Sequence, residues 1–286
     1  MDFKFYSVGE IKQYLDSLNL TVNKSFGQNF LINAGVADGI VRAMDINEED
    51  LVFEIGCGLG SLTNRILIKK PDFYGFEIDK GYITHLNKLF SSEPRFHLIA
   101  GDFLKTFEKS VAEIDRSKYR QTVFAGNLPY YITTPILDKI FKSEFGFDKI
   151  ITMVQKEVAE RITAGPGTKK YGSLSIFCQF YAEPKIISSV KPASFYPRPA
   201  VDSTVILFTK RKVSYNVKST ELFFKFVNSI FMNRRKQLKN NIECAVKLSP
   251  DEKEMIINGL SKSSVPLTGR GEELNIAKIV EIINNT

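Results

Sequence analysis

The chain has 286 residues, of which 43% are apolar and 25% are charged, a composition that is typical of globular proteins and excludes a disordered or fibrous chain. The apolar runs are short and interrupted by charges, so we expect no segment that spans a membrane, and the first residues lack the apolar stretch of a signal peptide. These features predict a cytoplasmic protein.

The cysteines and histidines limit the chemistry further. Cys57, Cys178 and Cys244 lie far apart without paired spacing, which fits neither a disulfide framework nor a zinc site. The two histidines, His85 and His97, are too few for a histidine-rich metal centre. We therefore expect no bound metal and a reaction that does not depend on histidine.

The net charge of +7 is concentrated toward the C-terminus. Residues 209–286 hold 14 Lys and Arg against 8 Asp and Glu, whereas the preceding 208 residues hold 25 against 24. This asymmetry fits a polyanionic partner that docks at the C-terminal end. It also fits an ordinary solvated surface, and charge alone does not decide between the two.

Helical and strand periodicities alternate through the first half of the chain. In chain order the predicted elements are helices at 11–18 and 36–44, a strand at 51–55, a helix at 62–68, a strand at 73–78, a helix at 82–90, strands at 96–100 and 122–125, a helix at 136–141 and a strand at 149–154. Strands that alternate with helices in this way predict a parallel sheet with helices on both faces.

The second half changes character. Residues 185–190 and 201–208 alternate strongly around a turn-rich segment and predict an antiparallel pair of strands. From Thr220 onward the pattern is helical, with a helix start at Ser249. We therefore predict an α/β, Rossmann-like domain at 1–212, with a mostly parallel sheet plus an antiparallel pair, and a small all-helical domain at 213–286.

A glycine-rich turn follows the strand at 51–55. From Glu54 to Gly60 the pattern is G-x-G-x-G with a preceding acid, and Gly56 and Gly58 would let the backbone approach a ligand closely. A dinucleotide fingerprint needs a glycine at position 61, where this chain has Ser61. The carboxylate of Glu54, two residues before Gly56, would repel a pyrophosphate. It is compatible with a cofactor that has an amino-acid end and a sulfonium cation.

Acidic residues follow the next two strands. Glu77 lies 21 residues after Gly56, a position from which a carboxylate can accept both hydroxyls of an adenosine ribose. Asp102 follows the third strand and could bind an adenine amino group; position alone leaves this role open. A solvated surface carboxylate is the alternative for both. The ends of parallel strands share one edge of the sheet, where such folds bind ligands.

The fourth strand leads into Asn127-Leu128-Pro129-Tyr130, the most informative segment of the chain. The Asn127 side-chain carbonyl and the Leu128 backbone carbonyl could accept the two hydrogens of an adenine amino group and aim its lone pair at a methyl donor. Pro129 would stiffen the turn and Tyr130 would stack on the base. The alternative is a turn with a buried tyrosine.

Several blocks together resemble the ribosomal RNA adenine dimethyltransferases, also called the rRNA adenine N(6)-methyltransferase family. They run in family order and are Lys24–Leu31, Glu54–Gly60, Asn127–Pro135, Gln155–Arg161, Tyr171–Ser175 and Phe195–Ser203. The closest resemblance is to the branch that dimethylates two adjacent adenosines near the 3′ end of small-subunit (16S) ribosomal RNA. It implies a class I methyltransferase domain, with the C-terminal domain binding RNA.

The resemblance also implies site residues. S-adenosylmethionine, which leaves as S-adenosylhomocysteine, would contact Asn29, Leu31, Gly56, Gly58, Glu77, Asp102 and Asn127. Tyr130 and Phe195 would sandwich a flipped adenine, because the base must leave its stack to be reached. The segment 233–238, with Arg234, Arg235 and Lys236, would face RNA phosphate, and Lys24 would add to that surface.

The implied partner is the small ribosomal subunit with its 16S-type RNA, bound by a monomer with no membrane contact, and the implied role includes subunit biogenesis. Three alternatives stay open. A large-subunit RNA enzyme that confers antibiotic resistance is usually shorter, with Ile in place of Leu128. A non-catalytic assembly factor would not need Glu77, Asp102 and Asn127. Adenine DNA methyltransferases usually carry Asp or Asn before Pro-Pro.

Overall fold

The computed structural model describes residues 6–17, 20, 22, 28–129 and 132–286, and the chain divides into two compact units. The first unit comprises Met1–Ala159 and Lys185–Lys210, and the second comprises Glu160–Pro184 and Arg211–Thr286. This partition differs from the predicted division at 212, because the segment 160–184 joins the C-terminal helices rather than the sheet. The functions assigned to 1–212 and 213–286 stay predictions.

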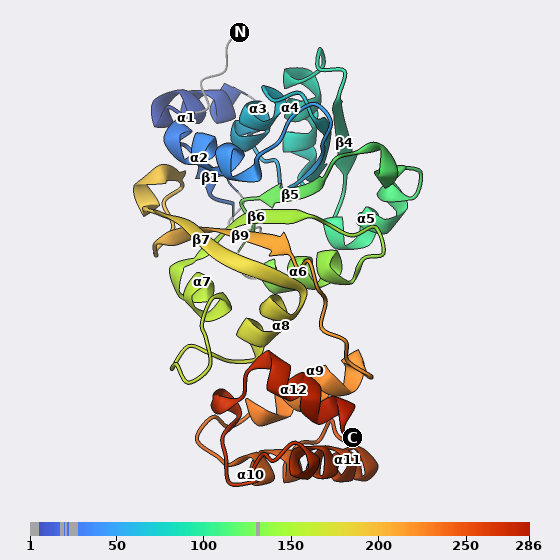
Figure 1. The fold of residues 1–286 in the computed structure, drawn as a ribbon. Coiled ribbons are helices and arrows are strands. Elements are labelled where there is room, and N and C mark those ends of the chain that lie inside the picture. The colour runs from blue at the N-terminus through green and yellow to red at the C-terminus, as the bar shows by residue number, and fades with distance from the viewer. Residues whose placement is uncertain (1–5, 18–19, 21, 23–27, 130–131) are drawn as a thin grey trace. The chain divides into compact units, whose positions relative to one another are not determined.

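A seven-stranded sheet forms the centre of the first unit, in the order β4-β3-β2-β5-β6-β9-β7 (Figure 1). Its strands are β2 (Leu51–Ile55), β3 (Asp72–Glu77), β4 (Phe96–Ala100), β5 (Thr122–Gly126), β6 (Lys149–Gln155), β7 (Ala182–Val190) and β9 (Ser203–Lys210). The five strands from β4 to β6 are parallel, and β9 pairs antiparallel with β6. The predicted α/β, mostly parallel fold is confirmed.

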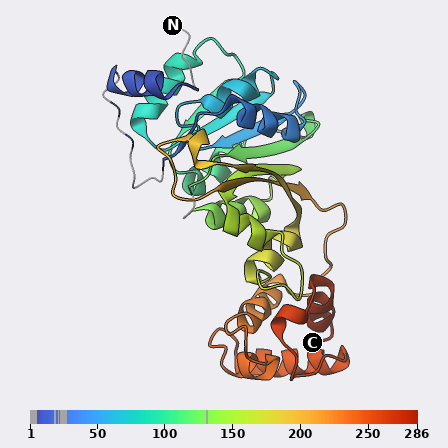
Figure 2. The ribbon, with the colours of Figure 1, turned by 90° about the vertical axis from the view of Figure 1, so that its left-hand side faces the viewer.

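Helices cover both faces of this sheet (Figures 1 and 2). The helices of the chain are α1 (Val8–Ser17), α2 (Ala34–Met44), α3 (Ser61–Leu67), α4 (Lys80–Leu89), α5 (Phe103–Val111), α6 (Thr133–Lys142), α7 (Lys156–Ile162), α8 (Ser173–Tyr181), α9 (Thr220–Ile230), α10 (Leu238–Glu243), α11 (Pro250–Lys262) and α12 (Ile276–Asn284). Adjacent strand residues point to opposite faces: Val52 packs with α2, α3 and α4, whereas Phe53 stacks on Phe124 and meets Phe107 of α5.

A second, two-stranded sheet lies beside the main one. Its strands β1 (Phe30–Leu31) and β8 (Phe195–Tyr196) are antiparallel, with Phe30 opposite Tyr196 and Leu31 opposite Phe195. The Ile32 N–H extends the pairing by donating to the Ser194 carbonyl at 2.8 Å. This pairing brings two segments together that are more than 160 residues apart in the sequence.

The second unit has its own apolar core. Tyr171 and Ile176 are 1% and 0% exposed and pack with buried side chains of α9, α10, α11 and α12. Ser249 caps α11, and its side chain and that of Glu252 bond each other's backbone N–H groups, which confirms the helix start predicted at this serine. No helix among the described residues is long and apolar enough to cross a membrane.

Candidate functional site

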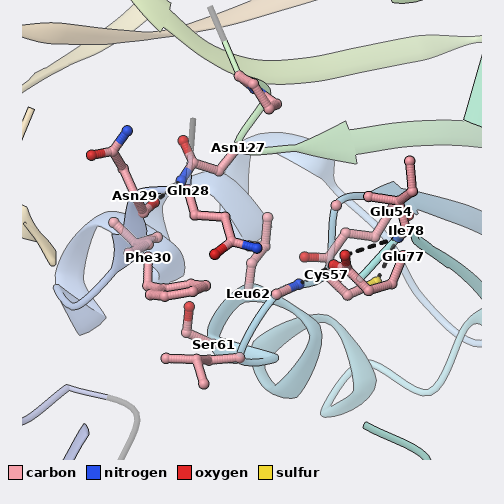
Figure 3. A pocket seen from close by; sticks show the side chains of 15 residues that line it. Gln28, Asn29, Phe30, Glu54, Cys57, Ser61, Leu62, Glu77, Ile78 and Asn127 are labelled. Carbon is pink, nitrogen blue, oxygen red and sulfur yellow. Dashed lines mark hydrogen bonds between the residues drawn. The ribbon is translucent and has the colours of Figure 1, made fainter. Parts of the chain in front are cut away.

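The glycine-rich turn after β2 contributes Gly56, Cys57 and Gly58 to the lining of a pocket, and Figure 3 shows the side chains around it. Gly56, Gly58 and Gly60 have φ angles of 76°, 53° and 83°, a region that residues with a Cβ rarely adopt. At Gly58 a Cβ would also lie 3.1 Å from the Phe30 ring, which covers the turn from β1. Glycine at these positions therefore keeps the loop tight and its backbone open toward the pocket.

Two pockets adjoin at the carboxyl edge of the sheet and share Gly56, Glu77, Ile78 and Pro129. The first also includes Asn29, Leu31, Glu54, Gly58 and Asn127, and the second includes Gly101, Asp102, Phe103, Ile132 and Ile136. All seven residues predicted to bind the cofactor thus line one or both pockets. Their individual roles stay predictions.

Glu54 is a buried carboxyl group at the side of the first pocket. It is 2% exposed, and its Oε2 accepts a hydrogen bond from Thr63 Oγ1 at 2.6 Å. Burial is the main reason that the pKa of Glu54 rises to about 8; the Thr63 hydrogen bond lowers it, and the charge of Glu77 raises it. A cation placed in this pocket would favour the ionised carboxylate.

Glu77, at the end of β3, is held by three backbone groups. Its Oε2 accepts the Gly58 N–H at 2.8 Å, and its Oε1 accepts the N–H groups of Ile78 and Asp79 at 2.9 Å each. Burial raises the pKa of Glu77, and these hydrogen bonds offset part of the rise. The carboxylate is fixed between the glycine turn and the second pocket, where it could accept hydroxyl groups.

Asp102 follows β4 and caps α5, with its Oδ1 accepting the Leu104 N–H at 3.0 Å. This bond orients the carboxylate at the wall of the second pocket. The same pocket has an apolar lining from Phe103, Ile132 and Ile136. A flat heteroaromatic ring with a polar edge would match this combination of an apolar slot and a carboxylate at its wall.

Asn127 follows β5 and lines the first pocket (Figure 3). Its Nδ2 donates to the Asn29 backbone carbonyl at 2.5 Å. This contact fixes which end of the amide faces Asn29, so that Oδ1 remains as an acceptor. The geometry gives the pocket an oriented carbonyl group without using any histidine.

The residues after Asn127 supply a second acceptor. The Pro129 carbonyl is used within the turn, since it accepts the Ile132 N–H at 3.1 Å and the Thr133 hydroxyl at 3.2 Å. Among the described residues, no donor forms a hydrogen bond with the Leu128 backbone carbonyl. The Leu128 residue is buried, with 3% of its surface exposed. The predicted stacking residue, Tyr130, lies outside the described residues.

Gly126 is a further residue of the site, which the sequence analysis did not identify. A Cβ at this position would lie 2.7 Å from the Ile55 carbonyl oxygen and 2.9 Å from a Leu128 side-chain atom. The absence of a side chain thus lets β5 end close to β2 and places Asn127 beside the glycine turn. A glycine directly before the Asn127 tetrapeptide was the available signal.

Phe195 does not line either pocket. Its ring is 1% exposed and belongs to the core around Leu31, Val190 and Val205. The pairing of β8 with β1 places it beside the segment that carries Asn29 and Leu31. Its predicted role in stacking on a base stays a prediction, and in this structure the ring is a core residue.

The predicted RNA-binding residues fall into different environments. Arg234 is bonded to the Tyr171 and Thr168 carbonyls and to Glu272. Arg235 and Lys236 are exposed, whereas Lys24 lies outside the described residues. The structure therefore does not present the three consecutive basic residues as equivalent, and their contact with RNA stays a prediction.

Comparison with known proteins gives a consistent result over most of the chain. Residues 19–280 match the model of the family described as ribosomal RNA adenine dimethylase. A Halothermothrix orenii protein named ribosomal RNA small subunit methyltransferase A is 37% identical, over 100% of this chain and 95% of that protein. A Clostridium botulinum protein of the same name is 39% identical, over 93% of this chain and 94% of its own length.

Solved structures match the fold. A dimethyladenosine transferase from Plasmodium falciparum has a TM-score of 0.73 and 24% identity, covering 88% of this chain and 95% of that one. The 23S rRNA methyltransferase ErmE has a TM-score of 0.66 and 20% identity, covering 90% and 99%. At these identities the two structures show the Rossmann-like fold alone.

Proposed function

The chain belongs to the ribosomal RNA adenine dimethylase family, and on this premise we propose that it dimethylates the 6-amino groups of two adjacent adenosines near the 3′ end of small-subunit ribosomal RNA. The observation that carries the proposal is the oriented amide of Asn127 beside the glycine turn. The full-length relatives named as small-subunit methyltransferases support the choice of substrate.

The two pockets fit S-adenosylmethionine, whose bound form supplies a methyl group on a positively charged sulfur. Glu54 offers a buried carboxyl that compensates a cation, and Glu77 offers a fixed carboxylate for the ribose hydroxyls. Asp102, above the apolar slot, would accept the adenine amino group. The donor set thus suits a cationic nucleoside with an amino-acid end, and Asn29, Leu31, Gly56 and Gly58 would complete its binding site.

The chain's part in the reaction is to activate a poor nucleophile. The lone pair of an adenine amino nitrogen is delocalised into the ring. Asn127 Oδ1 and the Leu128 carbonyl accept the two amino hydrogens, which draws the nitrogen toward tetrahedral geometry. Bound S-adenosylmethionine would supply the methyl group, and the amino nitrogen would give up a proton to solvent as it takes that methyl. Positioning and electrostatics carry this step.

The target base must leave its stack before it can reach Asn127. Tyr130 and Phe195 are the residues proposed to flank it, which would require the ring of Phe195 to become accessible in the complex. The chain is proposed to act as a monomer. Ribosomal substrates place the reaction in the cytoplasm, with a role in small-subunit biogenesis.

The proposal is tested by methyl transfer from labelled S-adenosylmethionine to small ribosomal subunits that lack the modification, followed by mass analysis of the RNA nucleosides. We expect dimethyladenosine in the small-subunit RNA. Transfer only to naked large-subunit RNA would assign the chain to the resistance enzymes instead. Tight subunit binding without transfer to either RNA would leave a non-catalytic assembly factor.

A further inference from the structure

The turn between α9 and α10 carries the basic residues of the second unit that the sequence analysis assigned to RNA. Its backbone is held from inside by Asn241, which is 0% exposed. The Asn241 Nδ2 lies 3.1 Å from the Ile230 carbonyl, 3.1 Å from the Asn233 carbonyl and 3.4 Å from the Lys236 carbonyl. One buried amide thus fixes the path of the whole turn.

Arg234, in the middle of this turn, is committed to other parts of the unit. Its Nη1 donates to the Tyr171 carbonyl at 2.6 Å, and its Nη2 donates to the Thr168 carbonyl at 3.1 Å and to Glu272 Oε2 at 2.7 Å. The guanidinium charge is therefore already compensated by a carboxylate and two carbonyls, which leaves little of it for a phosphate.

The same contacts secure the loop 163–172. The Gly167 N–H donates to the Glu272 carbonyl at 2.8 Å, and the Tyr171 hydroxyl donates to the Leu274 carbonyl at 2.9 Å. Arg234 and Glu272 thereby connect this loop, the turn after α9 and the segment before α12. We call this set of contacts the Arg234 latch.

Three cations remain exposed next to the latch. Arg235 and Lys236 follow Arg234 directly, and Lys169 lies between the two loop residues whose carbonyls Arg234 binds. Within the part of the chain that the structure describes, no carboxylate forms an ion pair with any of the three. Lys170 differs, because it is paired with Glu160.

We propose that Arg234 is a positioning residue that does not contact RNA, and that its latch holds Lys169, Arg235 and Lys236 as one preformed surface for RNA phosphates. This inference rests on the proposed function. Within the turn it assigns a positioning role to Arg234 and phosphate binding to Arg235 and Lys236. Holding two loops in place before binding lowers the ordering cost when a polyanion docks. Each phosphate contact should release counterions and steepen the salt dependence of binding.

The first test measures binding to small ribosomal subunits that lack the modification, over a salt series from about 50 to 200 mM. Lys169→Gln, Arg235→Gln and Lys236→Gln should each weaken binding and reduce the logarithmic salt slope by about 0.7 to 0.9. Arg234→Gln should weaken binding while the slope stays at the wild-type value, because no phosphate contact is removed. A slope loss in Arg234→Gln equal to that in Arg235→Gln would overturn the division of roles.

Glu272→Gln should change the affinity for RNA in opposite directions, depending on whether Arg234 binds phosphate or holds the latch. If Arg234 bound phosphate, removing a nearby negative charge would free the guanidinium and strengthen RNA binding. If the latch holds the surface, the same substitution weakens RNA binding and speeds hydrogen exchange of the amides in loop 163–172. Tighter binding by Glu272→Gln would therefore refute the proposal.

Matched controls separate local from general charge effects. Lys212 and Lys247 are exposed, lie outside both segments and form no ion pair among the described residues. The double variant Lys212→Gln, Lys247→Gln should keep the wild-type slope, and an equal loss there would overturn the localised surface. Methyl transfer by the wild-type chain is measured in parallel. Its absence would contradict the proposed function, whereas unexpected binding by the variants of an active chain would contradict only the present proposal.

Discussion

At the residue scale, Asn127 combines one fixed hydrogen bond with one available acceptor. Its Nδ2 is used by the Asn29 carbonyl, so the orientation of Oδ1 does not depend on the substrate. Asn127→Ala removes this acceptor and should lower kcat by roughly 10²- to 10³-fold, as expected for loss of one preorganised group. Binding of RNA should change little, because the side chain is small and lies inside the pocket.

Single-turnover methyl transfer and RNA-binding titrations together measure the effect of Asn127→Ala. Asn240→Ala, in an exposed position of α10, serves as the matched control and should behave as wild type. Survival of turnover in Asn127→Ala would show that the lone-pair argument is wrong.

Glu54 leads to a prediction about pH. Below about pH 8 this carboxyl holds a proton in the ligand-free protein, whereas a cation in the pocket favours its ionised form. Binding of S-adenosylmethionine should therefore release a proton and tighten as the pH rises toward 8. The stability of the ligand-free protein should change with pH in the opposite direction. Because the pKa of Glu54 is higher in the folded chain than in the unfolded chain, its contribution to stability falls as the pH rises from about 4.5 to about 8.

Calorimetric titration in buffers of different ionisation enthalpy measures the released proton directly. The other ionisable groups whose charges interact with Glu54 are Glu77, Cys57 and Tyr6. The cofactor's own amino group also titrates near pH 8, so Glu54→Gln is the reference that retains this second titration. Equal proton release by wild type and Glu54→Gln would contradict the prediction.

At the element scale, the pairing of β1 with β8 connects the first pocket to Phe195. The ring is 1% exposed within the main core, so Phe195→Ala should cost about 3–5 kcal/mol of unfolding free energy, whatever its role toward RNA. Denaturant unfolding with and without the substitution measures this cost. A change within about 0.5 kcal/mol would show that the ring lies at the surface in solution.

The same pair of strands marks the limit of what the sequence predicts. The strands β2 to β6 were predictable because local periodicity reports their burial, and the residues at their ends followed from the shared carboxyl edge. The strands β1 and β8 have two residues each, so no period exists to be read, and only the tertiary contact defines them.

Three helices, α5, α7 and α8, were missed, and α5 and α8 show different reasons. α5 places Phe103, Phe107 and Val111 at four-residue intervals on one buried face, a helical signal that was present but was not identified. α8 is rich in apolar residues on several sides, so it has little contrast between faces. Its side chains become interpretable only when the core that receives them is known.

At the scale of the whole molecule, the chain passes between the two units three times, after Ala159, Pro184 and Lys210. The segment 160–184 leaves the first unit, contributes to the second and returns before β9 is formed. The sequence predicted a single boundary because charge and periodicity change only near residue 212. A unit assembled from two distant segments cannot be seen in such a profile, since its boundaries are defined by packing.

This partition predicts the behaviour of a chain that ends at residue 212. Tyr171 and Ile176, which are 1% and 0% exposed, would lose the side chains of α9 to α12 that bury them. We expect the shortened chain to aggregate, although every described residue that lines the two pockets lies between residues 28 and 136. Light scattering and thermal unfolding of the shortened and full chains measure this.

The double substitution Tyr171→Ser, Ile176→Ser should act in opposite directions in the two chains. In the full chain it opens a packed core and should cost at least about 4 kcal/mol, because each buried side chain contributes at least about 2 kcal/mol. In the shortened chain it replaces exposed apolar surface and should restore solubility. A shortened chain that is soluble without these substitutions, and unfolds as cooperatively as the full chain, would mean that residues 160–184 belong with the sheet after all.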